Sequence, residues 1–153
     1  MVWFRSLLFQ VYFYASVCLH ALAISVLFFM PYRFLFGIAK LWARGMLFAG
    51  KYLCGLDYIV EGRENIPDEP SVIMIKHTTA FETYAQIAVF PPQTWVLKRE
   101  LLWIPIFGWG LAAVKPIAIN RGAGHHAVQQ VIEKGNARLK DGIWVTIFPE
   151  GTR

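Results

Sequence analysis

The fold of this chain is decided by the stretch IWVTIFPEGTR, which runs from Ile143 to Arg153. Residues 143–147 are apolar apart from one threonine and are rich in β-branched and aromatic side chains, which favours a strand buried on both faces of a parallel sheet. Pro149 and Gly151 then predict a turn directly after this strand. Because ligands of open α/β folds bind at the carboxyl ends of the strands, this turn is a candidate binding loop.

Short apolar runs alternate with helical patterns over residues 56–153, and this alternation predicts an α/β fold in which a sheet is flanked by helices. The expected strands cover residues 57–61, 71–76, 94–98, 116–119 and 143–148. The expected helices cover residues 81–89, 105–113 and 124–140. Residues 56–153 are therefore the expected globular domain of the chain.

The amino-terminal third has a different character. Residues 7–30 contain no Asp, Glu, Lys or Arg, and as a helix they would span about 36 Å at roughly 1.5 Å per residue. We therefore expect a transmembrane helix. A cleaved signal peptide is the alternative, but its apolar core is usually about 7 to 15 residues long and ends at a small-residue cleavage site. The sequence Pro31-Tyr32-Arg33-Phe34 offers no such site.

Basic residues flank this segment unequally, since only Arg5 precedes it. Four basic residues follow it closely, namely Arg33, Lys40, Arg44 and Lys51. Because positively charged flanks stay inside, we expect the globular domain on the cytoplasmic side of the cell (inner) membrane.

Residues 34–54 place apolar and aromatic side chains between these basic ones, which predicts an interfacial amphipathic helix in the lipid headgroup region. A helix packed onto the globular domain is the alternative. On the first interpretation, residues 1–55 form a membrane anchor that precedes the domain of residues 56–153.

The chain of 153 residues has a formal net charge of +5 and two cysteines. Its basic residues are scattered and no nucleic-acid-binding module is recognisable, so we expect no nucleic-acid partner. The charge favours anionic lipid, a phosphorylated substrate or an acidic carrier protein instead. Cys18 lies in the apolar segment, far in sequence from Cys54, which suggests neither a metal site nor a redox pair.

His77 and Glu82 are candidates for a general base and its partner. Positions five apart on an ideal helix point about 140° away from each other, so the two side chains would not meet within one helix. We therefore expect His77 in the loop after the strand 71–76 and Glu82 in the first turn of the next helix. There Glu82 would accept an imidazole N–H while the other ring nitrogen takes a proton from an alcohol. Taken alone, an exposed histidine beside an unrelated glutamate is the alternative.

Two arginines follow predicted strands. Arg153 ends the turn after the strand 143–148, where Gly151 allows close backbone approach and the guanidinium can hold a phosphate with two hydrogen bonds. Arg121 follows the strand 116–119 and is a candidate second ligand of that phosphate. Each arginine alone is typical of a solvated surface, whereas their shared position at strand ends favours a binding site.

Three blocks of the chain resemble a known family. The blocks around His77, around Asn120-Arg121 and from Phe148 to Arg153 are similar, in order and spacing, to the first three signature blocks of the glycerolipid acyltransferases. Specifically, they resemble the 1-acyl-sn-glycerol-3-phosphate acyltransferases, over about residues 56–153. The resemblance implies that His77 is the catalytic base and Glu82 its carboxylate partner. The residues implied to bind the acceptor are Lys98, Arg121, Glu150, Gly151, Thr152 and Arg153.

The resemblance also implies a reaction. A fatty acyl group would pass from acyl-CoA or acyl carrier protein to the 2-hydroxyl of 1-acyl-sn-glycerol-3-phosphate, a membrane lipid, to give phosphatidic acid, with no metal or prosthetic group. The chain has no Gly-x-Ser-x-Gly nucleophile motif, so we expect direct attack without an acyl-enzyme. The alternatives are another lysophospholipid or glycerol-3-phosphate as the acceptor, or an inactive membrane-bound fragment. The phosphate-directed arginines disfavour a thioesterase.

The sequence departs from the family's pattern in three respects. The family usually has Asp where this chain has Glu82, and its second block usually begins with Gly and an aromatic residue, where this chain has Val114-Lys115. A fourth, Pro-containing block would lie beyond Arg153. We therefore expect a carboxyl-terminally truncated domain and low activity of the 153-residue chain alone. The apolar segment 103–110 is a candidate wall of an acyl groove, with an ordinary core segment as the alternative.

Overall fold

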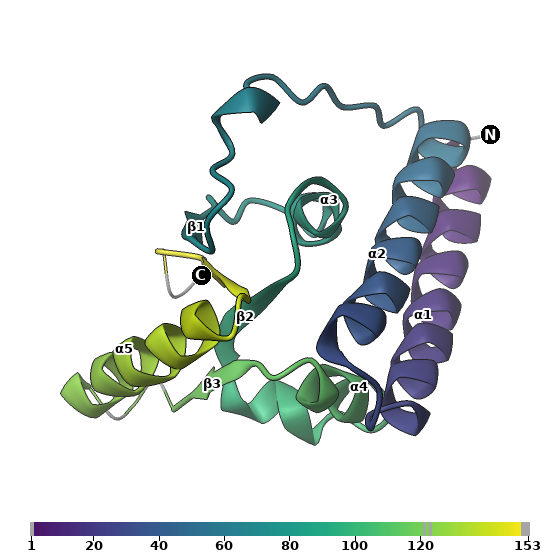
Figure 1. The fold of residues 1–153 in the computed structure, drawn as a ribbon. Coiled ribbons are helices and arrows are strands. Elements are labelled where there is room, and N and C mark those ends of the chain that lie inside the picture. The colour runs from purple at the N-terminus through teal and green to yellow at the C-terminus, as the bar shows by residue number, and fades with distance from the viewer. Residues whose placement is uncertain (1, 121, 123, 151–153) are drawn as a thin grey trace.

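The computed structural model of the chain describes residues 2–120, 122 and 124–150. Two helices open the chain, α1 (Val2–Val26) and α2 (Tyr32–Ala49), and they lie side by side as an antiparallel hairpin (Figure 1). A π-helical turn (Gly50–Cys54) extends α2 and ends at Gly55, whose φ of 70° lies in the left-handed region that favours glycine.

A four-stranded parallel sheet forms the centre of the remaining chain, in the order β1-β4-β2-β3. The strands are β1 (Val72–Met74), β2 (Gln93–Lys98), β3 (Ile117–Ile119) and β4 (Trp144–Ile147). Three helices connect them: α3 (Phe81–Val89), α4 (Phe107–Ala113), which follows a short 3-10 helix (Arg99–Trp103), and α5 (His125–Lys140). Because all four strands are parallel, their carboxyl ends meet at one edge of the sheet, and this edge carries the candidate site.

The stretch that predicts the fold occupies the centre of the sheet. β4 lies between β1 and β2, and its residues Trp144, Val145 and Thr146 are all buried. The hydroxyl of Thr146 donates a hydrogen bond to the side-chain oxygen of Gln93 on β2. The hydroxyl of Thr146 is therefore paired inside the core, as a buried polar group requires.

The helical hairpin is part of the same core as the sheet domain. Leu35, Phe36 and Met46 of α2 are almost fully buried, and they form one apolar cluster with Tyr84 of α3 and Val114 at the end of α4. The opposite face of α2 exposes large apolar side chains, among them Leu41 and Phe48. α2 thus combines the two alternatives predicted from the sequence. One face packs on the globular domain, and the opposite face is apolar and exposed, as expected of an interfacial helix.

The strand predicted at residues 57–61 is wrong. The segment runs as irregular chain between α2 and β1 (Figure 1), and Ile59 is 87% exposed. Asp57 pairs with Lys51 at 2.7 Å and accepts the backbone N–H of Tyr58 at 3.0 Å. A short apolar run forms a strand only where a neighbouring strand pairs with it. The other predicted strands and helices are present, with ends that differ by at most a few residues.

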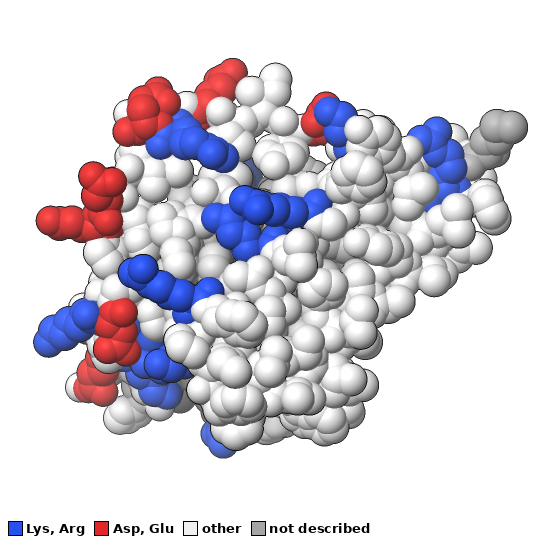
Figure 2. All heavy atoms as spheres, turned by 45° about the vertical axis from the view of Figure 1, so that its right-hand side comes forward, with Lys and Arg blue, Asp and Glu red and all other residues white. Residues whose placement is uncertain are grey.

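α1 is the one helix within the described residues that is long and apolar enough to cross a membrane by length and composition. It ends at Val26, before the predicted limit at residue 30. A core helix of a soluble protein and a signal sequence satisfy the same criteria. Figure 2, in which the right-hand side of Figure 1 is turned forward, shows a broad area without charged side chains at the lower right, whereas charged side chains gather at the left and centre of the view.

Candidate active site

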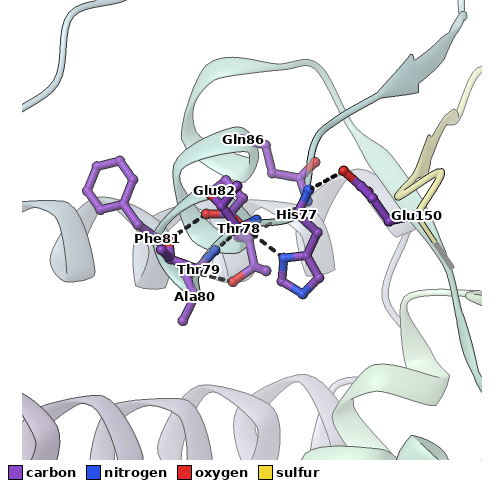
Figure 3. A network of polar contacts seen from close by, with 9 residues as sticks. His77, Thr78, Thr79, Ala80, Phe81, Glu82, Gln86 and Glu150 are labelled. Carbon is purple, nitrogen blue, oxygen red and sulfur yellow. Dashed lines mark hydrogen bonds and ion pairs between the residues drawn. The ribbon is translucent and has the colours of Figure 1, made fainter. Parts of the chain in front are cut away.

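His77 lies in the loop between β1 and α3, and Glu82 is the second residue of α3. The loop turns the histidine ring back towards the helix, so that Nδ1 lies 2.8 Å from the Glu82 Oε1 atom (Figure 3). The predicted arrangement of this pair is therefore present. Because a carboxylate oxygen only accepts hydrogen bonds, Nδ1 carries the proton and Nε2 is the ring nitrogen that can act as a base.

Several further hydrogen bonds hold the Glu82 carboxylate in place. Oε1 also accepts the backbone N–H groups of Thr78 and Thr79, and Oε2 accepts the Thr79 hydroxyl at 2.6 Å (Figure 3). Partial burial would by itself raise the pKa of Glu82, but the hydrogen bonds from the Thr79 side chain, from His77 and from the backbone outweigh it and lower this pKa to about 2. The carboxylate is therefore ionised at physiological pH and fixes the tautomer of His77.

Thr79 is a site residue that the sequence-based prediction missed. Its spacing to the glutamate, Thr79-x-x-Glu82, is that of a capping box at the start of a helix. In the structure the glutamate reaches back to the N–H of Thr79, which is one half of a capping box, but Ala80 is the N-cap residue and no side chain caps the helix. This pattern is the signal from which the position of Glu82 relative to the loop could have been derived.

Glu150 connects the turn after β4 to the histidine loop. Its Oε1 accepts the backbone N–H of His77 at 3.2 Å (Figure 3), and the ring of Phe148 lies beside the imidazole, with 4.7 Å between ring centroids. The resemblance assigned Glu150 only to acceptor binding. The structure adds a contact that positions the backbone of the candidate base.

Of the other residues that the resemblance assigns to acceptor binding, only Lys98 is described by the structure. Lys98 is the last residue of β2, and its exposed ammonium lies 3.8 Å from Glu100 Oε1. It lines the same cavity as His77 and Glu150. The other predicted acceptor-binding residues, Arg121, Gly151, Thr152 and Arg153, lie outside the described residues.

A cavity of about 830 Å³ extends from these strand ends into the helices. Its walls come from β2, α3 and α4, and from α1 and α2 of the hairpin, and they are mainly apolar. Of the segment 103–110, Phe107 and Gly110 line the cavity, whereas Trp103 and Trp109 are exposed. The predicted apolar groove is therefore formed by only part of that segment.

An oriented histidine on the wall of a mainly apolar cavity defines a site for general-base chemistry on a substrate with an apolar chain. Residues 57–153 match the sequence model of the family described as Acyltransferase. Since the match covers more than half of the chain, the chain belongs to the acyltransferase family.

Two relatives show which members of the family the chain is similar to. It is 46% identical over 122 residues to the 1-acyl-sn-glycerol-3-phosphate acyltransferase of Pseudomonas aeruginosa, a match covering 80% of this chain and 46% of that protein. It is 31% identical over 112 residues to the human 1-acyl-sn-glycerol-3-phosphate acyltransferase alpha, covering 72% and 40% respectively. The chain thus spans less than half the length of these curated relatives.

The fold is that of a solved acyltransferase. The crystal structure of the 1-acyl-sn-glycerophosphate (LPA) acyltransferase from Thermotoga maritima superposes with a TM-score of 0.74 at 22% sequence identity. The superposition covers 100% of this chain and 64% of that one. The helical hairpin and the parallel sheet therefore both belong to the shared fold.

Proposed function

We propose that the protein transfers a fatty acyl group to the 2-hydroxyl of 1-acyl-sn-glycerol-3-phosphate and so produces phosphatidic acid. The observation that carries the proposal is the hydrogen bond between His77, on the wall of the mainly apolar cavity, and the ionised Glu82. The names of the relatives support the choice of acceptor. The acyl donor is a thioester of coenzyme A or of acyl carrier protein.

The reaction proceeds by direct attack. Nε2 of His77 takes the proton of the 2-hydroxyl, and the oxygen forms a bond to the thioester carbonyl carbon. Glu82 stabilises the imidazolium that forms, through Nδ1. The tetrahedral intermediate collapses when the C–S bond breaks, and the departing thiolate takes the proton from the imidazolium. The products are the ester and the free thiol of the donor.

The acceptor phosphate needs cationic partners near His77. Lys98 lies on the wall of the same cavity, and we propose that it acts together with Arg121 and with the turn from Glu150 to Arg153. Arginine and lysine pair with phosphate through charge-assisted hydrogen bonds. The acyl chain of the donor lies in the apolar part of the cavity.

The protein works at a membrane, where its acceptor resides. The outward faces of α1 and α2 expose large apolar side chains, and these faces bury in lipid at a gain of about 1.5–3 kcal/mol for each fully buried side chain. We propose that α1 and α2 are the membrane anchor and that the active site lies on the cytoplasmic side of the inner membrane.

Replacing His77 by Ala tests the function. Membranes containing the protein are incubated with labelled palmitoyl-CoA and 1-acyl-sn-glycerol-3-phosphate, and labelled phosphatidic acid is measured. We expect His77→Ala to lower the rate by ~10² to 10⁴, whereas His126→Ala, at an exposed position on α5, leaves it unchanged. Equal rates for His77→Ala and the wild type, both above the rate of membranes without the protein, would exclude the catalytic role.

A panel of substrates defines the specificity in the same assay. Glycerol-3-phosphate and other lysophospholipids replace the acceptor, and acyl carrier protein thioesters replace the coenzyme A donor. We expect 1-acyl-sn-glycerol-3-phosphate to be the preferred acceptor. Absence of transfer with every acceptor and donor would indicate an inactive membrane-bound protein.

A further inference from the structure

A second histidine lines the cavity that His77 borders. His20 is contributed by helix α1, and its neighbours on the cavity wall include the apolar residues Val17, Ala21 and Ile24. The reaction proposed above gives His20 no role. A polar ring on an apolar wall indicates that something more than an alkyl chain is recognised there.

The orientation of the His20 ring is fixed by the helix itself. Nδ1 lies 2.8 Å from the carbonyl oxygen of Ser16, and because a carbonyl only accepts hydrogen bonds, Nδ1 must be protonated. The Ser16 side chain is also held, since its hydroxyl donates to the carbonyl of Phe13 at 3.1 Å and accepts the indole N–H of Trp42 at 3.1 Å. The part of the ring left to meet a ligand is therefore Nε2.

Within the described part of the chain, the hydrogen bond of the His20 ring is the one made by Nδ1. Nε2 is not among the buried unpaired atoms, so it is accessible to a ligand in the cavity. An alkyl chain in the cavity would cover this nitrogen without pairing it, which is unfavourable. A hydroxyl group on the chain would pair with it. Since a hydroxyl both donates and accepts, it matches Nε2 in the neutral and in the protonated ring.

We propose that His20 is a specificity-determining residue that selects acyl donors carrying a hydroxyl group along the chain. The proposal rests on the acyl transfer proposed above, because it places the donor chain in the cavity. The hydroxyl does not react. Its hydrogen bond to His20 Nε2 favours hydroxylated chains over plain ones of the same length.

Binding of unreactive donors tests the proposal independently of catalysis. Thioether analogues of palmitoyl-CoA are prepared with no hydroxyl or with one hydroxyl at successive carbons, and their dissociation constants are measured with the whole protein in detergent micelles. We expect one hydroxyl position to bind about 10-fold more tightly than the plain chain, the effect of one net hydrogen bond. In His20→Leu this preference should disappear, and the plain chain should bind more tightly than to the wild type.

Two further variants keep the test decisive. His20→Gln retains a polar group at this position and should keep part of the preference, which a general loss of folding would not do. Ile24→Leu changes an apolar residue of the same cavity wall and should leave the ratio between hydroxylated and plain chains unchanged. The proposal is overturned if no hydroxyl position is preferred by the wild type, or if His20→Leu keeps the preference. Failure of the wild type to transfer palmitate to any acceptor would instead contradict the proposed function, and the binding ratios would still decide the role of His20.

Discussion

At the scale of single residues, the Glu82 carboxylate does more than pair with a histidine. It receives hydrogen bonds from the His77 ring, from the backbone of Thr78 and from both the backbone and the side chain of Thr79. These hydrogen-bond donors of the loop that carries the candidate base therefore all point to one carboxylate. A glutamate, one methylene longer than the aspartate usual in the family, reaches all of these donors from the first turn of α3.

This network predicts a stability that depends on pH. The folded-state pKa of Glu82, about 2, lies below its ordinary value of 4.5, so the ionised carboxylate stabilises the folded state above pH 4.5, and this contribution is lost as the pH falls through 2. We expect the wild type to unfold at a higher temperature than Glu82→Gln at neutral pH, with a difference that narrows between pH 4.5 and 2. The measurement is thermal unfolding in detergent micelles.

Glu133→Gln provides the control for that series. Glu133 is exposed on α5, and the hydrogen bond recorded for its side chain comes from Gln129 at 3.2 Å. We expect its unfolding temperature to follow that of the wild type at every pH. A difference between wild type and Glu82→Gln that stays constant down to pH 2 would mean that the network does not lower the pKa of Glu82.

At the scale of elements, sequence patterns correctly predicted the structural features that depend on residues close together in the chain. The helix predicted at residues 81–89 has those bounds in the structure, and the placement of His77 before it followed from helix geometry alone. The strand predicted at 57–61 is wrong because pairing depends on a distant partner. The contact of Glu150 with the His77 backbone was not predictable for the same reason, since it depends on β1 and β4 being neighbours in the sheet.

The close packing of α1 against α4 could likewise not be predicted from the sequence. A Cβ atom added at Gly110 would lie 2.6 Å from the carbonyl oxygen and 2.7 Å from the Cα atom of Ala21. Both contacts are to backbone, so a side chain at position 110 would push the two helices apart. We expect Gly110→Ala to destabilise the protein by about 1–3 kcal/mol and to lower activity, because Phe107 and Leu111 of α4 line the cavity.

Gly37→Ala is the matched substitution for this prediction. Gly37 is an exposed position within α2, and an added Cβ would meet no atom within 4 Å. Because glycine in a helix costs roughly 0.5–1 kcal/mol relative to alanine, we expect a small gain in stability there. The unfolding temperatures of both variants are measured and compared with that of the wild type. A Gly110→Ala protein as stable as Gly37→Ala would show that α1 and α4 do not pack this closely.

At the scale of the whole molecule, the hairpin restricts how the chain can meet a bilayer. The guanidinium of Arg5 donates to the backbone carbonyl of Tyr52 at 2.7 Å, so α1 begins where α2 and its extension end. From Gly55 to β1 the chain is irregular except for one short 3-10 turn. Such a segment leaves backbone groups without partners and cannot cross the hydrocarbon core exposed to lipid. Since α1 also packs against α4, the packed structure favours a hairpin that enters one leaflet from the side of the sheet domain.

This geometry predicts that the amino terminus and the sheet domain lie on the same side of the membrane, whereas a crossing α1, the expectation from hydropathy alone, would separate them. One epitope is placed at the amino terminus and a second, in a separate protein, at Ile59 in the exposed loop. Sealed inverted and right-side-out vesicles are then treated with protease. We expect both epitopes to be digested in inverted vesicles and protected in right-side-out ones. Digestion of the amino-terminal epitope only in right-side-out vesicles would show that α1 crosses the bilayer and that its packing against α2 and α4 is not kept in the membrane.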